Sequence, residues 1–219
     1  MSLTELEYVM LTPDHLDDVF QLLVNHFYPR ENFTLGLGFS PETKLNMDRQ
    51  FIRTCLESGL SVGAREKSTR RLIGIMLNSI ITADSLPKPT LSTNSTEAEI
   101  KYARFSKLKG SLVDIFQDPG VNRVLNLSRG CVHPNYGRRG VMTKLIQMSF
   151  DLGIKQSCQL ARAGVSSLYT EKALLRLGFK VRAALDFQTL EENLLDLSRM
   201  YYKKFKVMTN SLSSRKSTL

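Results

Sequence analysis

Apolar residues recur along the chain with two different spacings, and their alternation predicts a mixed α/β fold. Spacings of three and four, typical of a helix with one buried face, follow Thr12-Pro13, Ser40-Pro41 and Gly140. At the first two places an N-cap residue precedes a proline at the first helical position. The predicted strands are 6–11, 60–65, 72–81, 126–132, 158–165, 179–187 and 198–207, and further helices are predicted at 100–116 and 168–177.

Glycines and polar stretches divide these elements. Gly59, Gly153 and Gly178 are predicted to end the helices that precede them. The remaining stretches are predicted as an aromatic-rich loop at 26–33, a flexible turn at Gly36 and Gly38, a Ser/Thr/Pro-rich surface loop at 82–96 and a short helical turn at 191–197.

The best-defined stretch, residues 126–152, has the pattern of a buried strand, a turn and a helix. Two glycines, Gly137 and Gly140, flank Arg138 and Arg139 where the helix begins. Glycine lets the backbone approach a ligand, and the first helical N–H groups have no intrahelical partner. Together with the helix dipole and the guanidinium groups, these N–H groups favour an anion such as a pyrophosphate. From the turn alone, a basic loop that binds nothing stays open as the alternative.

The composition indicates one globular domain, which we expect to span residues 1–208, with a surface insertion at 82–99 and a disordered basic tail at 209–219. Hydrophobic residues make up 42% of the 219-residue chain and charged residues 23%, as in ordinary globular proteins. The chain has no apolar run long enough to span a membrane, and its N-terminus lacks the pattern of a signal peptide. Three cysteines without Cys-x-x-Cys spacing are expected to be reduced thiols, which favours a cytoplasmic protein.

The net charge of +9 raises the question of a polyanionic partner. The basic residues are dispersed, without interleaved aromatic residues or zinc-finger spacing. We therefore expect no nucleic acid and no membrane as partner, and the chain to be a monomer or a weak homodimer.

The stretch Val132-His133-Pro134-Asn135-Tyr136-Gly137-Arg138-Arg139-Gly140-Val141 resembles the acetyl-coenzyme A loop of the GNAT acetyltransferases. That family has a strand ending in Val-x-Pro, then Tyr, then Arg/Gln-x-x-Gly-x-Gly/Ala. Gly137 replaces the usual Arg or Gln, and Met142 replaces a small residue and is expected to crowd the pyrophosphate. The helical stretch at 100–116 resembles an insertion of the insect-type arylalkylamine N-acetyltransferases.

The resemblance implies a mixed, mostly antiparallel twisted sheet with helices on both faces, splayed after Val132 between its two central parallel strands. It implies acetyl-coenzyme A as cofactor and no metal. The implied cofactor contacts are Cys131, Val132, His133, Gly137, Arg138, Arg139, Gly140, Val141, Met142, Thr143, Ser167 and Tyr169. Cys131 is expected to be a small buried residue rather than a nucleophile, and His133 a surface residue.

Two loosely matching segments suggest catalytic groups. Phe27-Tyr28-Pro29-Arg30-Glu31 resembles the Phe-Phe-x-x-Glu-Pro segment of the insect-type enzymes, which implies that Glu31 is the general base. The alternative is a solvated glutamate paired with Arg30. Val165-Ser166-Ser167-Leu168-Tyr169-Thr170 resembles their Ser-Ser-x-Tyr-Ser segment, which implies catalytic or substrate-binding hydroxyls at Ser166 and Thr170.

Alternatives stay open for the second segment and for the aromatic residues. Ser166 or Ser167 is equally a helix N-cap. Leu174 stands where many GNAT enzymes have a catalytic tyrosine, and Tyr169 is the candidate to replace it. The aromatic residues Phe27, Tyr28, Phe33 and Phe39 are candidates for an amine pocket, or belong to the core.

The resemblance implies acetyl transfer from coenzyme A to an arylalkylamine of the dopamine, serotonin, tyramine or octopamine type, by direct attack in a ternary complex. Two other functions remain open. One is a GNAT enzyme for another acceptor, such as a polyamine or a protein lysine, or one that transfers a fatty-acyl group. The other is a non-catalytic module that binds coenzyme A or a protein partner.

Overall fold

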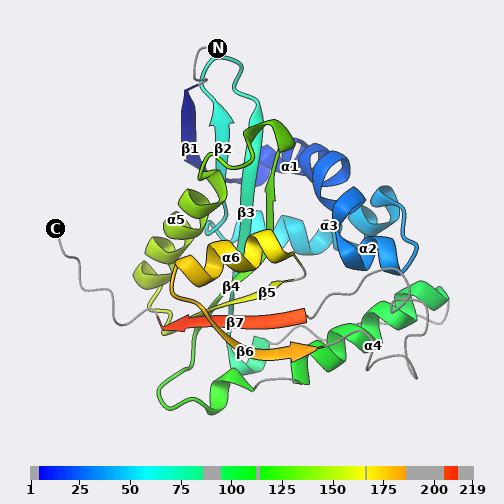
Figure 1. Ribbon diagram of the computed structural model, residues 1–219, viewed down its shortest axis with the longest axis vertical. Helices are drawn as coiled ribbons and strands as arrows, with labels where there is room; N and C mark the ends of the chain where they lie inside the picture. The colour runs from blue at the N-terminus through cyan, green and yellow to red at the C-terminus, as the bar shows by residue number, and fades with distance from the viewer. Residues whose placement is uncertain (1–4, 86–94, 112–113, 166, 186–204, 212–219) are drawn as a thin grey trace.

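The computed structural model describes residues 5–85, 95–111, 114–165, 167–185 and 205–211. A seven-stranded sheet with the order β1-β2-β3-β4-β5-β7-β6 forms its centre (Figure 1). The strands are β1 (Leu6–Met10), β2 (Val62–Glu66), β3 (Leu72–Ile81), β4 (Val124–Val132), β5 (Leu160–Val165), β6 (Lys180–Leu185) and β7 (Phe205–Ser211). Strands β4 and β5 are parallel and all other neighbours are antiparallel, so the predicted mixed sheet is confirmed.

Helices cover both faces of the sheet (Figure 1). The α-helices are α1 (Leu16–Leu22), α2 (Asn32–Gly36), α3 (Pro41–Glu57), α4 (Glu97–Ser111), α5 (Val141–Lys155) and α6 (Leu168–Arg176). The 3-10 turns are η1 (Pro13–His15), η3 (Tyr28–Arg30), η4 (Ala83–Ser85), η5 (Ile115–Gln117) and η6 (Pro134–Tyr136), and η2 (Leu23–Phe27) is a π-helical turn.

Two hydrophobic layers fix which helix lies on which face. Leu145, Ile146 and Phe150 of α5 pack with strand residues on one face. Helices α1 and α3 pack on the opposite face, where Ile52 of α3 and Ile75 of β3 belong to the same buried cluster. The side chains of a strand alternate between faces, so β3 and β4 contribute to both layers.

The sheet opens between β4 and β5. Their pairing covers only Val124 to Leu127 and Leu160 to Ala163, after which β4 continues beside β3 alone up to Val132. The splay predicted after Val132 therefore begins earlier, beyond Leu127. A β-bulge marks the place, because Leu77 pairs with Arg129 while Asn78 pairs with Leu127, which leaves Ser128 as the extra residue.

Several predicted boundaries are wrong. The helix predicted at 100–116 is α4 at Glu97–Ser111 with the separate turn η5, and Gly36, predicted in a flexible turn, is the last residue of α2.

Two further errors have local reasons. Residues 26–33 are not an irregular loop, because η2, η3 and α2 follow one another there and Pro29 lies within the first turn of η3. Gly153 does not end its helix, which continues to Lys155 with Gly153 buried. The left-handed residue after this helix is Ser157, with φ of 55°.

The C-terminal predictions are tested only in part. Strand β7 extends to Ser211, so the disordered tail predicted to begin at residue 209 begins too early. The helical turn predicted at 191–197 and the first residues of the strand predicted at 198–207 lie outside the described residues, as does the tail beyond 211. In the described part of the chain, no helix combines the length and the apolar character needed to cross a bilayer.

Candidate active site

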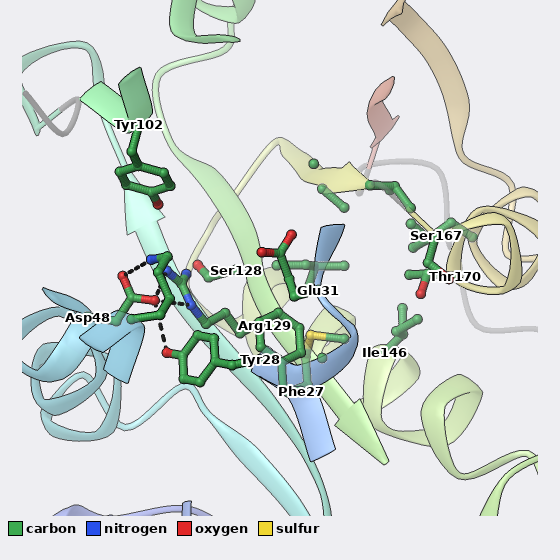
Figure 2. A pocket seen from close by; sticks show the side chains of 18 residues that line it. Phe27, Tyr28, Glu31, Asp48, Tyr102, Ser128, Arg129, Ile146, Ser167 and Thr170 are labelled. Carbon is green, nitrogen blue, oxygen red and sulfur yellow. Dashed lines mark hydrogen bonds and ion pairs between the residues drawn. The ribbon is translucent and has the colours of Figure 1, made fainter. Parts of the chain in front are cut away.

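A cleft of about 910 Å³, part of it open to solvent, lies where β4 and β5 separate (Figure 2). The bulge of β4 and the end of β5 form its centre, through Leu127 to Gly130 and Ala163 to Val165. Side chains from both layers of helices complete the walls, namely Phe27, Tyr28, Glu31, Lys44, Asp48, Met76, Tyr102, Ile146, Ser167, Thr170 and Leu174. The cleft therefore passes through the sheet and joins its two faces.

The turn before α5 has the geometry of an anion site. Arg138 and Gly140 have left-handed φ angles of 63° and 75°, and Gly140 is the N-cap of α5, without a side chain to cap it. The first hydrogen bond of this helix joins the Lys144 N–H to the Gly140 carbonyl. In the described part of the chain, the N–H groups of Val141, Met142 and Thr143 donate to no acceptor. These free donors and the helix dipole fit the pyrophosphate of coenzyme A.

Met142 does not crowd this turn, contrary to expectation. Its thioether reaches across to β4, where a Cβ added to Gly130 would lie 3.0 Å from the Met142 Cε and 2.8 Å from the Met76 Cε. The side chain thus packs in the layer between α5 and the sheet, while the Met142 amide stays at the turn. The departure from the family pattern leaves the backbone donors free.

The open edge of β4 presents different backbone groups from those predicted. The His133 N–H donates to the Ile73 carbonyl of β3 at 2.8 Å. Because hydrogen bonds alternate along an antiparallel strand, Cys131 also faces β3, whereas Gly130 and Val132 direct their N–H and C=O groups toward the splay. Of the three residues predicted to bind the pantetheine arm through their backbone, only Val132 is so oriented. Gly130 is the residue that the sequence analysis missed.

Glu31 caps helix α2 and lines the cleft. Its Oε2 accepts hydrogen bonds from the Thr34 N–H at 2.8 Å and the Thr34 Oγ1 at 3.0 Å. Arg30 is not its partner, because the Arg30 guanidinium donates to the His26 carbonyl instead. In the described residues, the Glu31 Oε1 accepts no hydrogen bond. One oxygen therefore fixes the carboxylate, and the other is available in the cleft.

A buried charge cluster on the α3 side of the cleft was not predicted as part of the site. Asp48, 6% exposed, accepts from the Lys44 Nζ at 2.7 Å through Oδ1. Its Oδ2 accepts from the Arg129 Nη2 at 2.6 Å, the Arg129 Nε at 3.1 Å and the Tyr28 hydroxyl at 2.9 Å (Figure 2).

Electrostatics keep the cluster ionised. Burial alone would raise the pKa of Asp48, but the charges of Arg129 and Lys44 outweigh it and hold that pKa below its usual value. Burial and the neighbouring carboxylate raise the pKa of the Tyr28 hydroxyl, which therefore stays a hydrogen-bond donor. The sequence held two signals of this cluster, a charged residue in the apolar stripe of α3 and an arginine in the middle of a central strand.

The opposite end of the cleft carries the hydroxyls of Ser167 and Thr170 (Figure 2). Ser167 is the N-cap of α6, but its side chain makes no capping hydrogen bond, so the capping alternative does not hold for this residue. Leu174 lines the cleft as an aliphatic group. Tyr169 is 81% exposed and outside the cleft lining, which contradicts a role as general acid, and Ser166 lies outside the described residues.

The predicted aromatic pocket is correct in part. Phe27 and Tyr28 line the cleft, together with Tyr102 of α4, which the sequence analysis missed. Phe39 is not in the lining; it packs with its ring 6.4 Å from that of Tyr102. The side chain of Phe33 lies outside the described part of the structure.

His133 and Cys131 are structural rather than chemical groups. His133 is buried, not a surface residue as predicted, and its ring lies 4.3 Å from the ring of His26. Burial raises the pKa of the Cys131 thiol to about 12, which fits the expected inert residue. Among the residues that the structure describes, no group of three or more His, Cys, Asp and Glu side chains is arranged to hold a metal ion.

No protein-family model matches the chain, and no curated protein does. Solved structures do match. Arylalkylamine N-acetyltransferase 2 from Aedes aegypti has a TM-score of 0.82 at 17% identity over 95% of this chain and 99% of that one. A mosquito arylalkylamine N-acetyltransferase like 5b gives 0.81 at 18% identity over 94% and 100%. Polyamine N-acetyltransferase from Drosophila melanogaster gives 0.77 at 15% identity over 94% and 100%. The chain therefore has the GNAT acetyltransferase fold, as predicted.

Proposed function

We propose that this chain is an acetyl-coenzyme A-dependent N-acetyltransferase that acts on arylalkylamines of the dopamine, serotonin, tyramine and octopamine type. One observation carries the proposal: a single cleft through the splayed sheet has a carboxylate with an unused oxygen on one wall and two hydroxyls on the other. N–H donors that meet no acceptor in the described chain stand on the same face as the hydroxyls, at the start of α5. The fold of the acetyltransferases named above supports the reaction class.

The cofactor half is built from main-chain groups. The amides of Val141, Met142 and Thr143 would hold the pyrophosphate, with Arg138 and Arg139 beside it. The open edge of β4, at Gly130 and Val132, would pair with the amides of the pantetheine arm as a further strand would. When bound, acetyl-coenzyme A supplies the activated acyl group, so the protein needs no nucleophile of its own.

Glu31 is the proposed general base. An amine must lose a proton before or as it attacks a thioester, and a carboxylate within hydrogen-bond reach can take that proton. The Thr34 contacts fix the carboxylate, and Oε1 is the oxygen left to accept the proton. On the opposite wall, the Thr170 and Ser167 hydroxyls are candidates to donate a hydrogen bond to the departing sulfur.

The lining favours an aromatic amine over a polyamine. The rings of Phe27 and Tyr102 offer apolar surface on the acceptor side, and the fully buried Tyr28 contributes to the same wall. Only Glu31 and Asp48 are acidic among the described residues of the lining, and Asp48 is already paired with two cations. A polyamine would carry a second positive charge toward this cluster without a free carboxylate to receive it.

The proposal is tested on the purified protein by two measurements. Calorimetry with acetyl-coenzyme A should show binding at physiological cofactor concentrations, and thiol release should rise on addition of tyramine, dopamine or serotonin but little with agmatine or spermidine. Absence of cofactor binding would favour the non-catalytic module. Binding without turnover of any arylalkylamine would contradict the proposed substrate class.

A further inference from the structure

The charge cluster around Asp48 has more hydrogen-bond donors than its carboxylate uses. The Lys44 Nζ donates to Oδ1, and the Arg129 Nε and Nη2 donate to Oδ2. A lysine ammonium and a guanidinium have only donors and no acceptor. In the described part of the structure, the Arg129 Nη1 and the remaining Nζ hydrogens meet no acceptor, and both side chains line the cleft.

The cluster also has a surplus of positive charge. Two cations, Lys44 and Arg129, share one carboxylate, and the residue Lys44 is only 2% exposed. The other acidic residue of the lining, Glu31, has no ion pair with either cation in the described chain. Two buried cations with a single counter-charge leave a net positive charge in this wall, so a ligand that brings an acceptor or a negative charge to it is stabilised.

The position of the cluster relative to Glu31 gives it a place in substrate recognition. Figure 2 shows Asp48 and Arg129 toward one end of the cleft, Ser167 and Thr170 toward the other, and Glu31 between them. An acceptor with its nitrogen at Glu31 therefore extends its far end toward the cluster. The Lys44 Nζ lies 4.4 Å from the ring centre of Tyr102 and 5.9 Å from that of Tyr28, beside the aromatic walls of this end.

We propose that Lys44 and Arg129, held by Asp48, form a specificity-determining end wall for the acceptor. This wall recognises an amine whose far end carries a hydrogen-bond acceptor, such as a phenolic oxygen or a carboxylate, and it rejects a second cation. The inference rests on the proposed function, because it assumes that the reacting nitrogen lies at Glu31. It narrows the proposed substrates to amines whose far end carries a hydrogen-bond acceptor.

A series of para-substituted phenethylamines tests the wall, since only the far end of the ligand changes. The four amines carry hydrogen, hydroxyl, carboxylate or aminomethyl at the para position. Their affinities for the coenzyme A-loaded protein are measured by calorimetry, and their kcat/KM values by thiol release. Because a hydrogen bond to a charged donor is stronger than a neutral one, the hydroxyl and carboxylate compounds should bind at least about tenfold tighter than the unsubstituted amine. The aminomethyl dication should bind more weakly than all others.

Two variants locate the preference. Lys44→Met nearly keeps the length of the side chain but removes its donors and charge. It should reduce the differences in affinity among the four ligands about tenfold. Affinity for the hydroxyl and carboxylate compounds should fall more than affinity for the unsubstituted amine. Arg53→Met removes an exposed cation from the same helix and should leave the series as in wild type. The wild-type ranking needs no variant, so the test stands even if Lys44→Met does not fold.

The outcomes separate the inference from the proposed function. If all four amines are acetylated with equal kcat/KM, or the dication binds as tightly as the phenol, the end wall is refuted while the enzyme assignment stands. If the affinities rank as expected but no amine is acetylated, the enzyme assignment is refuted while the proposed specificity of the end wall is supported. If none of the amines binds, both the enzyme assignment and the end wall are refuted.

Discussion

The two halves of the cleft differ in the chemical groups that form them, which are main-chain groups in one half and side chains in the other. The cofactor half consists of main-chain groups from one continuous stretch, from Gly130 on β4 to Thr143 in the first turn of α5. The acceptor half consists of side chains from η3, α3, α4 and β4, which the fold brings together around Asp48. A backbone N–H group remains in place whichever side chain its residue carries, whereas a side-chain cluster changes with each substitution. Under the proposed function, the cofactor half would fix the reaction and the acceptor half would fix the substrate.

The largest expected effect comes from the carboxylate at the junction of the halves. Glu31→Gln retains an oxygen that can accept from Thr34 but cannot take a proton, so turnover should fall between about a hundredfold and ten-thousandfold. Affinity for acetyl-coenzyme A should not change. Steady-state thiol release and calorimetry measure the two quantities, with Glu42→Gln, on α3 away from the cleft lining, as the control. Unaltered turnover would mean that the base lies elsewhere.

The acceptor half should also be the half on which stability depends most. Asp48→Asn leaves Lys44 and Arg129 buried without a counter-charge, and breaking a buried ion pair from one side costs about 3–5 kcal/mol. Urea denaturation of wild type and variant measures the loss. Glu57→Gln, exposed at the end of the same helix, is the matched control and should change the free energy of unfolding by less than about 0.5 kcal/mol. Equal effects of the two substitutions would show that the cluster is not a structural centre.

The cofactor half can be tested without changing any side chain of the cleft. Gly140 and Gly120 have φ of 75° and 77°, and a Cβ at either would meet nothing within 4 Å. Substituting alanine at either position should therefore lower the free energy of unfolding by about 1–2 kcal/mol, because both residues have a left-handed backbone conformation. Only Gly140→Ala should weaken coenzyme A binding, by about tenfold if one hydrogen bond to the pyrophosphate is lost. If Gly120→Ala weakens binding as much, the turn is not the anion site.

The smallest expected effect is the pH dependence of the stability that Asp48 contributes to the acceptor half, which should appear only at acid pH. The folded pKa of Asp48 is lowered, so its contribution to stability is fully present above its unfolded pKa of about 3.9 and is lost as pH falls through the lower folded value. The difference in free energy of unfolding between wild type and Asp48→Asn should therefore be constant from pH 7 to pH 5 and shrink only below about pH 4. Denaturation curves across this range measure it. A difference that already shrinks at pH 6 would indicate another titrating group.

The sequence predicted the strand, turn and helix of the cofactor half because their signal is local. The spacing from Val132 to Val141 contains the strand end, the turn and the helix start in one run, and the helical period then locates α5. What it missed there depends on register. Only the pairing of His133 with Ile73 shows that Gly130 and Val132, rather than Cys131, face the splay.

The acceptor half was predicted only where a resemblance pointed, at Glu31 and its neighbouring aromatic residues. Asp48 lies in the apolar stripe of α3, but its partner Arg129 lies on another element and no spacing rule connects them. Tyr102 entered the site through α4, whose place against the sheet is a matter of packing. Tyr169 was misplaced because its helical position was known but its face was not.

A crystal structure of the protein with coenzyme A would locate both the pyrophosphate and the sulfur. We expect the pyrophosphate at the amides of Val141, Met142 and Thr143, and the thiol in the splay between Ser128 and Thr170, facing the free oxygen of Glu31. A nucleotide bound away from this turn, or a Glu31 carboxylate directed away from the sulfur, would contradict this expectation.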